Sequence, residues 1–220
     1  MENNSTIKIF LPKAIEQTSS SITKPVSTYA FGPNSSYSKL SLDVDSKPRV
    51  HVESLDTVSS PDAVVDSTIE KVSQWFLSIA SMSNKKLQKL CYYAYCWFIV
   101  FNNDLEAFTS EDNSGIAVLC ADRFEAWIHG PVCPRLYHRY RGYGWHDIPK
   151  VVSKPEFSKE LESLLEQVWE AYGGFTADEL EAISHEETPW KKARKGYKDG
   201  DACSNEISNY DILYYYSNLG

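Results

Sequence analysis

The chain has 220 residues and a mass of 25.0 kDa, with a formal net charge of −8 and an isoelectric point near 5.2. Hydrophobic residues make up 42% and charged residues 24%, which is typical of a globular protein with one ordinary domain and room for a tail. The acidic balance disfavours broad binding of a nucleic-acid backbone, which needs a basic face. The longest apolar run, Cys91 to Phe101, is about half of the roughly 20 residues that span a bilayer, so we expect no membrane insertion.

The five cysteines predict a reducing compartment. They are Cys91, Cys96, Cys120, Cys133 and Cys203. Their number is odd and they form no CxxC pair, so the sequence indicates neither a disulfide framework nor a zinc knuckle. The N-terminus has no basic stretch ahead of an apolar core, so no secretory signal is indicated. We therefore expect free thiols in a cytoplasmic protein.

Residues 1–61 differ in composition from the rest of the chain. Serine and threonine dominate this segment, tryptophan is absent from it, and its apolar residues have no helical or strand periodicity. Such a sequence cannot offset its ordering entropy by burial, so it predicts a low-complexity, mobile extension. Within it, the apolar residues of Ile7 to Ile15 leave open a partner-binding arm that folds on contact.

Residues 62–220 are aromatic-rich and periodic, and predict one compact, mainly α-helical domain with at most one small β-hairpin. A first helix ends near Ile79, and Ser83 is placed to cap a second helix that extends to Phe101. That second helix is apolar nearly all round, which predicts burial in the middle of the domain.

The remaining elements follow in chain order. We expect a short strand at Ile116–Cys120, a helix from Pro131 or Pro134 to about Arg141, and a loop over residues 142–155. Four further helices are indicated, over residues 157–172, 177–184, 188–194 and from about 208. Gly173-Gly174 ends the first of these, and Thr176 with Glu179 forms a capping box for the second.

Four blocks of this domain resemble a known family. They read KLQKLCYYA at 86–94, FEAWIHGPV at 124–132, YGGFTADEL at 172–180 and SHEETPW at 184–190. In this order and spacing they resemble the SocA-like antitoxin family, also called the Panacea domain, over roughly residues 65–218. The resemblance implies an antitoxin of a bacterial or phage toxin–antitoxin pair, which neutralises its toxin by direct protein–protein binding. The toxin is expected to be encoded next door. A proteolytic adaptor that delivers the toxin to a protease is the alternative.

Polar and aromatic positions of these blocks are the candidate partner-binding residues. They are Lys89, Tyr92, Glu125, Trp127, His129, Gly130, Pro131, His185, Glu186 and Trp190. Two turns, at 125–132 and 185–190, combine charged residues and imidazoles with a proline and a tryptophan, so a rigid backbone can present them to a partner.

The alternative interpretation of these turns is structural. In it, Trp127 and Trp190 pack in the core, and Glu125 pairs with a lysine such as Lys89. His185 lies near the end of a predicted helix, where the helix dipole favours the charged imidazolium.

The sequence favours neither an enzyme nor a cofactor-binding protein. The spacing of His129, His138, His185, Glu186 and Glu187 matches no metal motif, and nucleophile and phosphate-loop signatures are absent. One basic segment, Lys191, Lys192, Arg194, Lys195 and Lys198, lies beside Trp190 and Tyr197. It leaves three interpretations open: a solvated segment, a docking patch for an acidic toxin surface, or a site for single-stranded nucleic acid.

Overall fold

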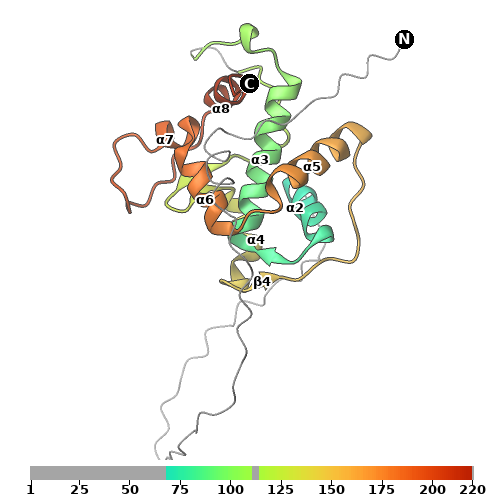
Figure 1. Cartoon of the computed structure of the whole chain (residues 1–220). Coiled ribbons are helices and arrows are strands. Elements are labelled where there is room, and N and C mark those ends of the chain that lie inside the picture. The colour runs from blue at the N-terminus through green and yellow to red at the C-terminus, as the bar shows by residue number, and fades with distance from the viewer. Residues whose placement is uncertain (1–67, 111–113, 220) are drawn as a thin grey trace, which may run out of the picture.

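The computed structural model describes residues 68–110 and 114–219 (Figure 1), and the predicted extension at residues 1–61 lies outside them. The helices are α2 (Thr68–Ile79), α3 (Asn84–Asn102), α4 (Pro134–Tyr140), α5 (Lys159–Tyr172), α6 (Ala177–Glu186), α7 (Thr188–Ala193) and α8 (Asn209–Ser217). Two antiparallel pairs of short strands accompany them: β1 (Met82–Ser83) with β4 (Asp147–Ile148), and β2 (Glu125–Trp127) with β3 (Gly130–Val132). The described part of the chain is therefore mainly helical, as predicted.

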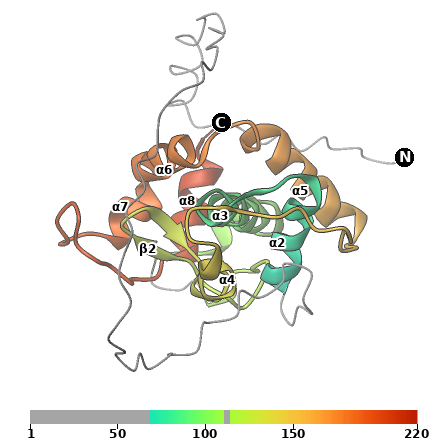
Figure 2. The same cartoon turned by 90° about the horizontal axis from the view of Figure 1, so that it is seen from below.

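The helix α3 lies at the centre of this arrangement. Figure 2 views it almost along its axis, with α2 and α5 on one side and β2 and α7 on the other. It contacts α2, α4, α5, α6, α8 and β3. Residues on all its faces are buried, including Trp97, which is 2% exposed. The predicted cap is present, because the Ser83 hydroxyl accepts a hydrogen bond from the Lys86 amide at 3.3 Å.

Aromatic side chains connect α3 to α5 and α8. The ring of Tyr93 stacks on that of Tyr172 with centroids 3.9 Å apart, and Trp97 Nε1 donates to the Tyr172 hydroxyl at 3.3 Å. Trp97 also meets Tyr216 edge to face at 5.4 Å. Such pairs add to the free energy gained by burial of the rings. The core is therefore built outward from the aromatic face of α3.

The strand predicted at Ile116–Cys120 is wrong. The side chain of Asn103 forms hydrogen bonds with the amide and carbonyl groups that a neighbouring strand would otherwise bond. Its Oδ1 accepts from the Ala117 amide at 2.8 Å, and its Nδ2 donates to the Ala117 carbonyl at 2.9 Å. No strand forms within residues 114–120.

The hairpin instead lies in the second block of the family resemblance. Glu125 pairs with Val132 and Trp127 with Gly130, which leaves Ile128 and His129 as the turn. Pro131 is part of β3, so α4 begins at Pro134, the later of the two predicted starts. The predicted loop at 142–155 also contains a short 3₁₀ turn and β4. The strands β1 and β4 have only two residues each, which is too short to give a periodic pattern in the sequence.

The predicted capping box of α6 and the predicted end of α5 are confirmed, and the structure adds two serine caps that were not predicted. Thr176 and Glu179 form the reciprocal hydrogen bonds of a capping box at the start of α6. Ser158 caps α5 and Ser208 caps α8 through their hydroxyl groups, and Gly173 ends α5. These local signals fixed helix boundaries to within a few residues because each satisfies backbone amides that the first turn leaves free.

All five cysteines are free thiols, as predicted, and the structure shows that all five are buried. Burial raises the pKa of the Cys133 thiol to about 11 and that of Cys120 to about 12. Within residues 68–110 and 114–219, none of the helices is long and apolar enough to cross a membrane.

Candidate functional site

Three segments of the family resemblance meet at the backbone of Gly130. This glycine has φ near +90°, and a Cβ atom on it would lie 2.6 Å from Ser184 Oγ and 2.7 Å from Lys89 Cε. The Lys89 ammonium donates to the Pro131 carbonyl at 3.1 Å. The central helix, the β2–β3 turn and α6 are therefore in contact at one residue that has no room for a side chain.

Lys89 is buried at this contact, with 1% of its surface exposed. Burial lowers the pKa of its ammonium to about 7, although the negative charge of Glu181 acts to raise it. The predicted pair between Lys89 and Glu125 is wrong, because the Glu125 carboxylate accepts from Trp127 Nε1 at 2.6 Å instead. Lys89 thus stabilises the turn through a backbone carbonyl rather than through an ion pair.

Glu181 of α6 lies between the buried lysine and the exposed turn. It forms an ion pair with Lys85, and its Oε1 lies 3.0 Å from His129 Nδ1. Burial opposes the charged form of this carboxyl, but the hydrogen bonds from Lys85 and His129 outweigh it and lower the pKa of Glu181. Lys85 also binds Asp178 at 2.7 Å. This network connects the tip of the turn to α3 and α6.

The α7 helix holds the β2 strand from the other side. Trp190 Nε1 donates to the Trp127 carbonyl at 3.1 Å, and Arg194 Nη1 donates to the Ala126 carbonyl at 2.9 Å. The Trp190 ring stacks on the imidazole of His185, with centroids 4.1 Å apart. Burial lowers the pKa of His185, so the expectation of a charged imidazolium at the end of α6 is wrong.

Four neighbouring side chains of this region reach the surface. Ile128 is 38% and Tyr137 is 37% exposed, the His129 side chain is 68% exposed, and Trp127 packs edge to face on Tyr137 at 4.9 Å. We call Trp127, Ile128, His129 and Tyr137 the turn surface. It joins apolar area to an imidazole on a backbone that α3, α6 and α7 hold in place.

The structure divides the ten sequence-predicted site residues by depth. Four are buried, namely Lys89, Tyr92, Gly130 and Pro131; four are half-buried, namely Glu125, Trp127, His185 and Trp190; two are exposed, namely His129 and Glu186. The buried Tyr92 packs on Phe124, the residue before β2, with ring centroids 5.4 Å apart. The buried members therefore support the turn from within, and only the others can contact a partner.

Sequence reasoning missed Glu187, the buried carboxyl at the junction of α6 and α7. It is 0% exposed and accepts from the Tyr216 hydroxyl at 2.8 Å. Burial raises its pKa to about 8. In the sequence, Glu187 belongs only to a set of residues that matches no metal motif, and nothing there marks it as buried. Glu181 and Ser184 were also missed as contacts of the turn.

The described residues give little support to a metal site or a nucleic-acid site. They contain no group of three or more histidine, cysteine, aspartate or glutamate side chains that could hold a metal ion. In the basic segment, Lys191 pairs with Glu186 and Lys192 with Asp211, each at 2.7 Å, and Arg194 is buried. These contacts neutralise part of the positive charge that a nucleic acid would need.

Residues 117–191 match the family model described as antitoxin SocA-like, Panacea domain. This part of the chain is similar to the Panacea family. The matched range is about a third of the chain; it contains the β2–β3 hairpin, α4, α5 and α6, whereas α3 and α8 lie outside it. The similarity implies an antitoxin role, with a cognate toxin as partner. None of the curated proteins or solved structures compared with the chain gives a match.

Proposed function

We propose that the chain neutralises a toxin protein by binding it directly, and that the turn surface is the centre of the interface. The observation that supports this most is the contact at Gly130, where three blocks of the family resemblance fix the backbone of an exposed turn. Interfaces draw most of their energy from a few well-placed anchors, often aromatic. A turn that is already held in place also loses less entropy on binding.

In this proposal the candidate residues have two kinds of role. Lys89, Tyr92, Gly130 and Pro131 are positioning residues, because they are buried under the hairpin. Trp127 belongs to the turn surface, Glu125, His185 and Trp190 form the half-buried wall behind it, and His129 and Glu186 offer exposed polar contacts. The partial neutralisation of the basic segment supports a protein partner over a nucleic acid.

The experiment compares two substitutions at exposed apolar positions. Ile128→Asp places a charge in the turn surface, whereas Trp145→Asp places one at a residue that is 86% exposed elsewhere. Each variant is co-expressed with the protein encoded by the adjacent gene, after its thermal melt is shown to match the wild type. We expect Ile128→Asp to reduce capture of that protein at least tenfold and to abolish growth rescue, and Trp145→Asp to retain both.

Full rescue by Ile128→Asp would place the interface elsewhere on the chain. The same cells separate direct neutralisation from the adaptor alternative. If binding alone neutralises the toxin, an immunoblot shows an unchanged amount of toxin in rescued cells. A fall in that amount, reversed by protease inhibition, would favour the adaptor instead.

A further inference from the structure

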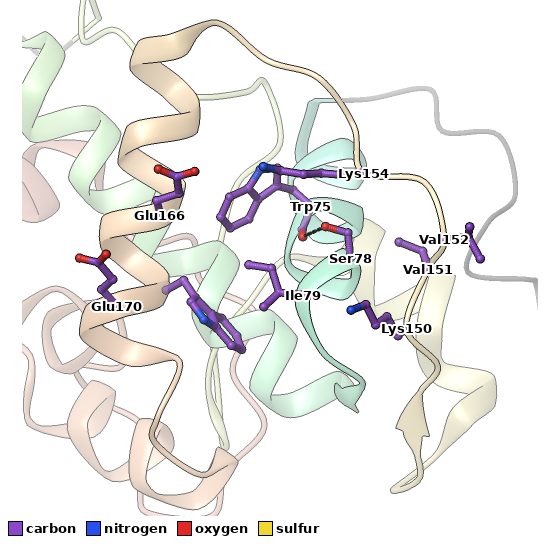
Figure 3. Close-up of a pocket in the computed structure, with 10 residues that line it drawn as sticks. Trp75, Ser78, Ile79, Lys150, Val151, Val152, Lys154, Glu166 and Glu170 are labelled. Atoms are coloured by element: carbon purple, nitrogen blue, oxygen red, sulfur yellow. Dashed lines mark hydrogen bonds between the residues drawn. The ribbon is translucent and has the colours of Figure 1, made fainter.

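A pocket of about 780 Å³ lies between α2, α5 and residues 150–154, and it shares no residue with the turn surface (Figure 3). Its apolar lining consists of Trp75, Ile79, Val151, Val152 and Trp169. The volume falls within the range of pockets that hold a ligand. Val152 at its edge is 96% exposed, so a large apolar side chain there is covered by nothing among the described residues.

The indole of Trp75 supplies a second observation that points to an occupant. The residue is 1% exposed, yet its Nε1 group has no hydrogen-bond acceptor among the described residues. Figure 3 shows this nitrogen beside the side chain of Lys154, whose ammonium lies 5.1 Å from the centre of the indole ring. Buried donors in native proteins nearly always have a partner. A backbone carbonyl that displaces the Lys154 side chain from the indole would provide one.

Charges of both signs line the pocket, with Lys150 and Lys154 on the wall opposite α5, and its α5 side favours an occupant that is apolar and basic. Glu166 and Glu170 line it from successive turns of α5, and both are exposed. Neither has an ion-pair partner in the part of the chain that the structure describes, whereas Lys154 is already paired with Glu162 at 3.2 Å. Two available carboxylates beside an apolar pocket suit a segment that alternates apolar residues with lysines.

We propose that the occupant is the segment Ile7 to Ile15 of the same chain. It reads IKIFLPKAI, and within residues 1–61 it has the densest group of large apolar side chains. Its Lys8 and Lys13 complement the carboxylates of α5. Pro12 disfavours helical backbone at Leu11, so the segment suits an extended conformation.

The connection is long enough for docking within one molecule. The 52 residues between Ile15 and Thr68 would span about 40 Å even as a random coil, whereas α2, from its start to the pocket, is about 18 Å long. Tethering also gives the segment an effective concentration near the millimolar range. A modest intrinsic affinity is therefore sufficient, and the chain needs no second molecule to fill the pocket.

The test is hydrogen exchange on the full chain, followed by mass spectrometry. We expect amides of residues 7–15 to exchange at least tenfold more slowly than in the Phe10→Asp, Leu11→Asp double variant. Amides of residues 150–154 should lose protection in the same variant. Ser19→Asp with Ser20→Asp adds the same charge outside the segment, and should leave both regions unchanged.

Substitutions in the pocket make the test reciprocal. Glu166→Lys with Glu170→Lys should release residues 7–15, whereas Glu106→Lys with Glu156→Lys, at exposed positions outside the pocket, should not. No slowed exchange at 7–15, or slowed exchange that the α5 substitutions leave intact, overturns the proposal. Protection that disappears on dilution assigns the pocket to a second copy, and protection of 150–154 only when the toxin is added assigns it to the toxin. Either result also overturns docking in the same chain.

Discussion

Gly130 shows how one residue can hold a turn in place. Its φ near +90° is a conformation that residues with a side chain rarely adopt, and the space where a Cβ would lie is filled by Ser184 and Lys89. Both restrictions act together, so backbone conformation and packing are coupled at this position. Gly130 therefore also fixes the position of the exposed turn residues Ile128 and His129.

Gly130→Ala should therefore be more destabilising than the same change at a glycine with similar φ and free space. Gly200 has φ near +93° and nothing within 4 Å of the place where a Cβ would lie, so Gly200→Ala isolates the backbone effect, about 1 kcal/mol. Gly130→Ala adds overpacking against Lys89 and Ser184, for a further 1–3 kcal/mol or so. Denaturant midpoints of both variants measure the difference. Equal losses would mean that α3 and α6 yield easily at this contact.

Glu187 makes stability depend on pH in a defined direction. Its pKa is raised to about 8 in the folded chain, whereas the unfolded carboxyl titrates near 4.5. Between these values the folded state holds a proton that the unfolded state has lost, so stability falls as pH rises. Tyr92, Tyr93 and Cys96 of α3, Tyr172 of α5 and Tyr216 of α8 surround it, and no cation is among them.

Glu187→Gln should remove this dependence while it keeps the shape of the side chain. From pH 5 to pH 7, the free energy of unfolding of the wild type should fall by about 2–3 kcal/mol relative to that of the variant. The comparison stops at pH 7, below the pKa of about 8 of the folded carboxyl. Lys89, with its pKa lowered to about 7, acts in the opposite direction but is present in both proteins, so its effect cancels in the difference. Urea titrations at both pH values provide the measurement, and parallel profiles would show that Glu187 is charged when folded.

At the scale of the element, α3 accounts for most of the core. Its buried aromatic face contacts both α5 and α8, so loss of one large side chain there leaves a cavity between helices that are far apart in the sequence. Cavities of this kind add to the lost transfer free energy because the surroundings relax only in part.

Trp97→Ala should destabilise the chain by about 3–5 kcal/mol. The tryptophan is 2% exposed, and its indole donates to Tyr172. Tyr214→Ala, at a tyrosine of α8 that is 52% exposed, serves as the control and should change the midpoint little. Chemical denaturation followed by circular dichroism compares them. A loss below about 1 kcal/mol for Trp97→Ala would contradict a central role for α3.

The elements that the sequence predicted well are those with local causes. The apolar pattern of α3 and the caps Ser83 and Thr176 act within one or two helical turns, so they can be recognised from the sequence alone. The contact of Gly130 with Lys89 and Ser184 joins residues about 40 to 55 positions apart, and only the tertiary fold brings them together. The strand expected at 116–120 failed for the same reason, because Asn103 satisfies its backbone from the end of α3.

At the scale of the whole molecule, one helix connects nearly all the others. Since α3 contacts α2, α4, α5, α6, α8 and the hairpin, few elements can separate without exposing its faces. Small domains with one shared core usually unfold in a single step.

We expect residues 68–219 to unfold as one unit. Far-ultraviolet circular dichroism reports on the helices, and fluorescence reports on six tryptophans, five of which lie in α2, α3, β2, α5 and α7. The two signals should give the same denaturant midpoint. Two separate transitions would show that the hairpin and α7 open independently of the central helix, and that the turn surface is less firmly held than its contacts indicate.

The five buried thiols can report how often each part of the fold opens. A thiol reacts as its thiolate and only where a reagent can reach it, and in the folded protein burial raises the pKa of Cys91, Cys96, Cys120 and Cys133. Each modification must then wait for a local opening of the structure. The alkylation rate of each cysteine therefore measures how often the structure opens at that position. The order in which the cysteines react would show which parts of the fold open first.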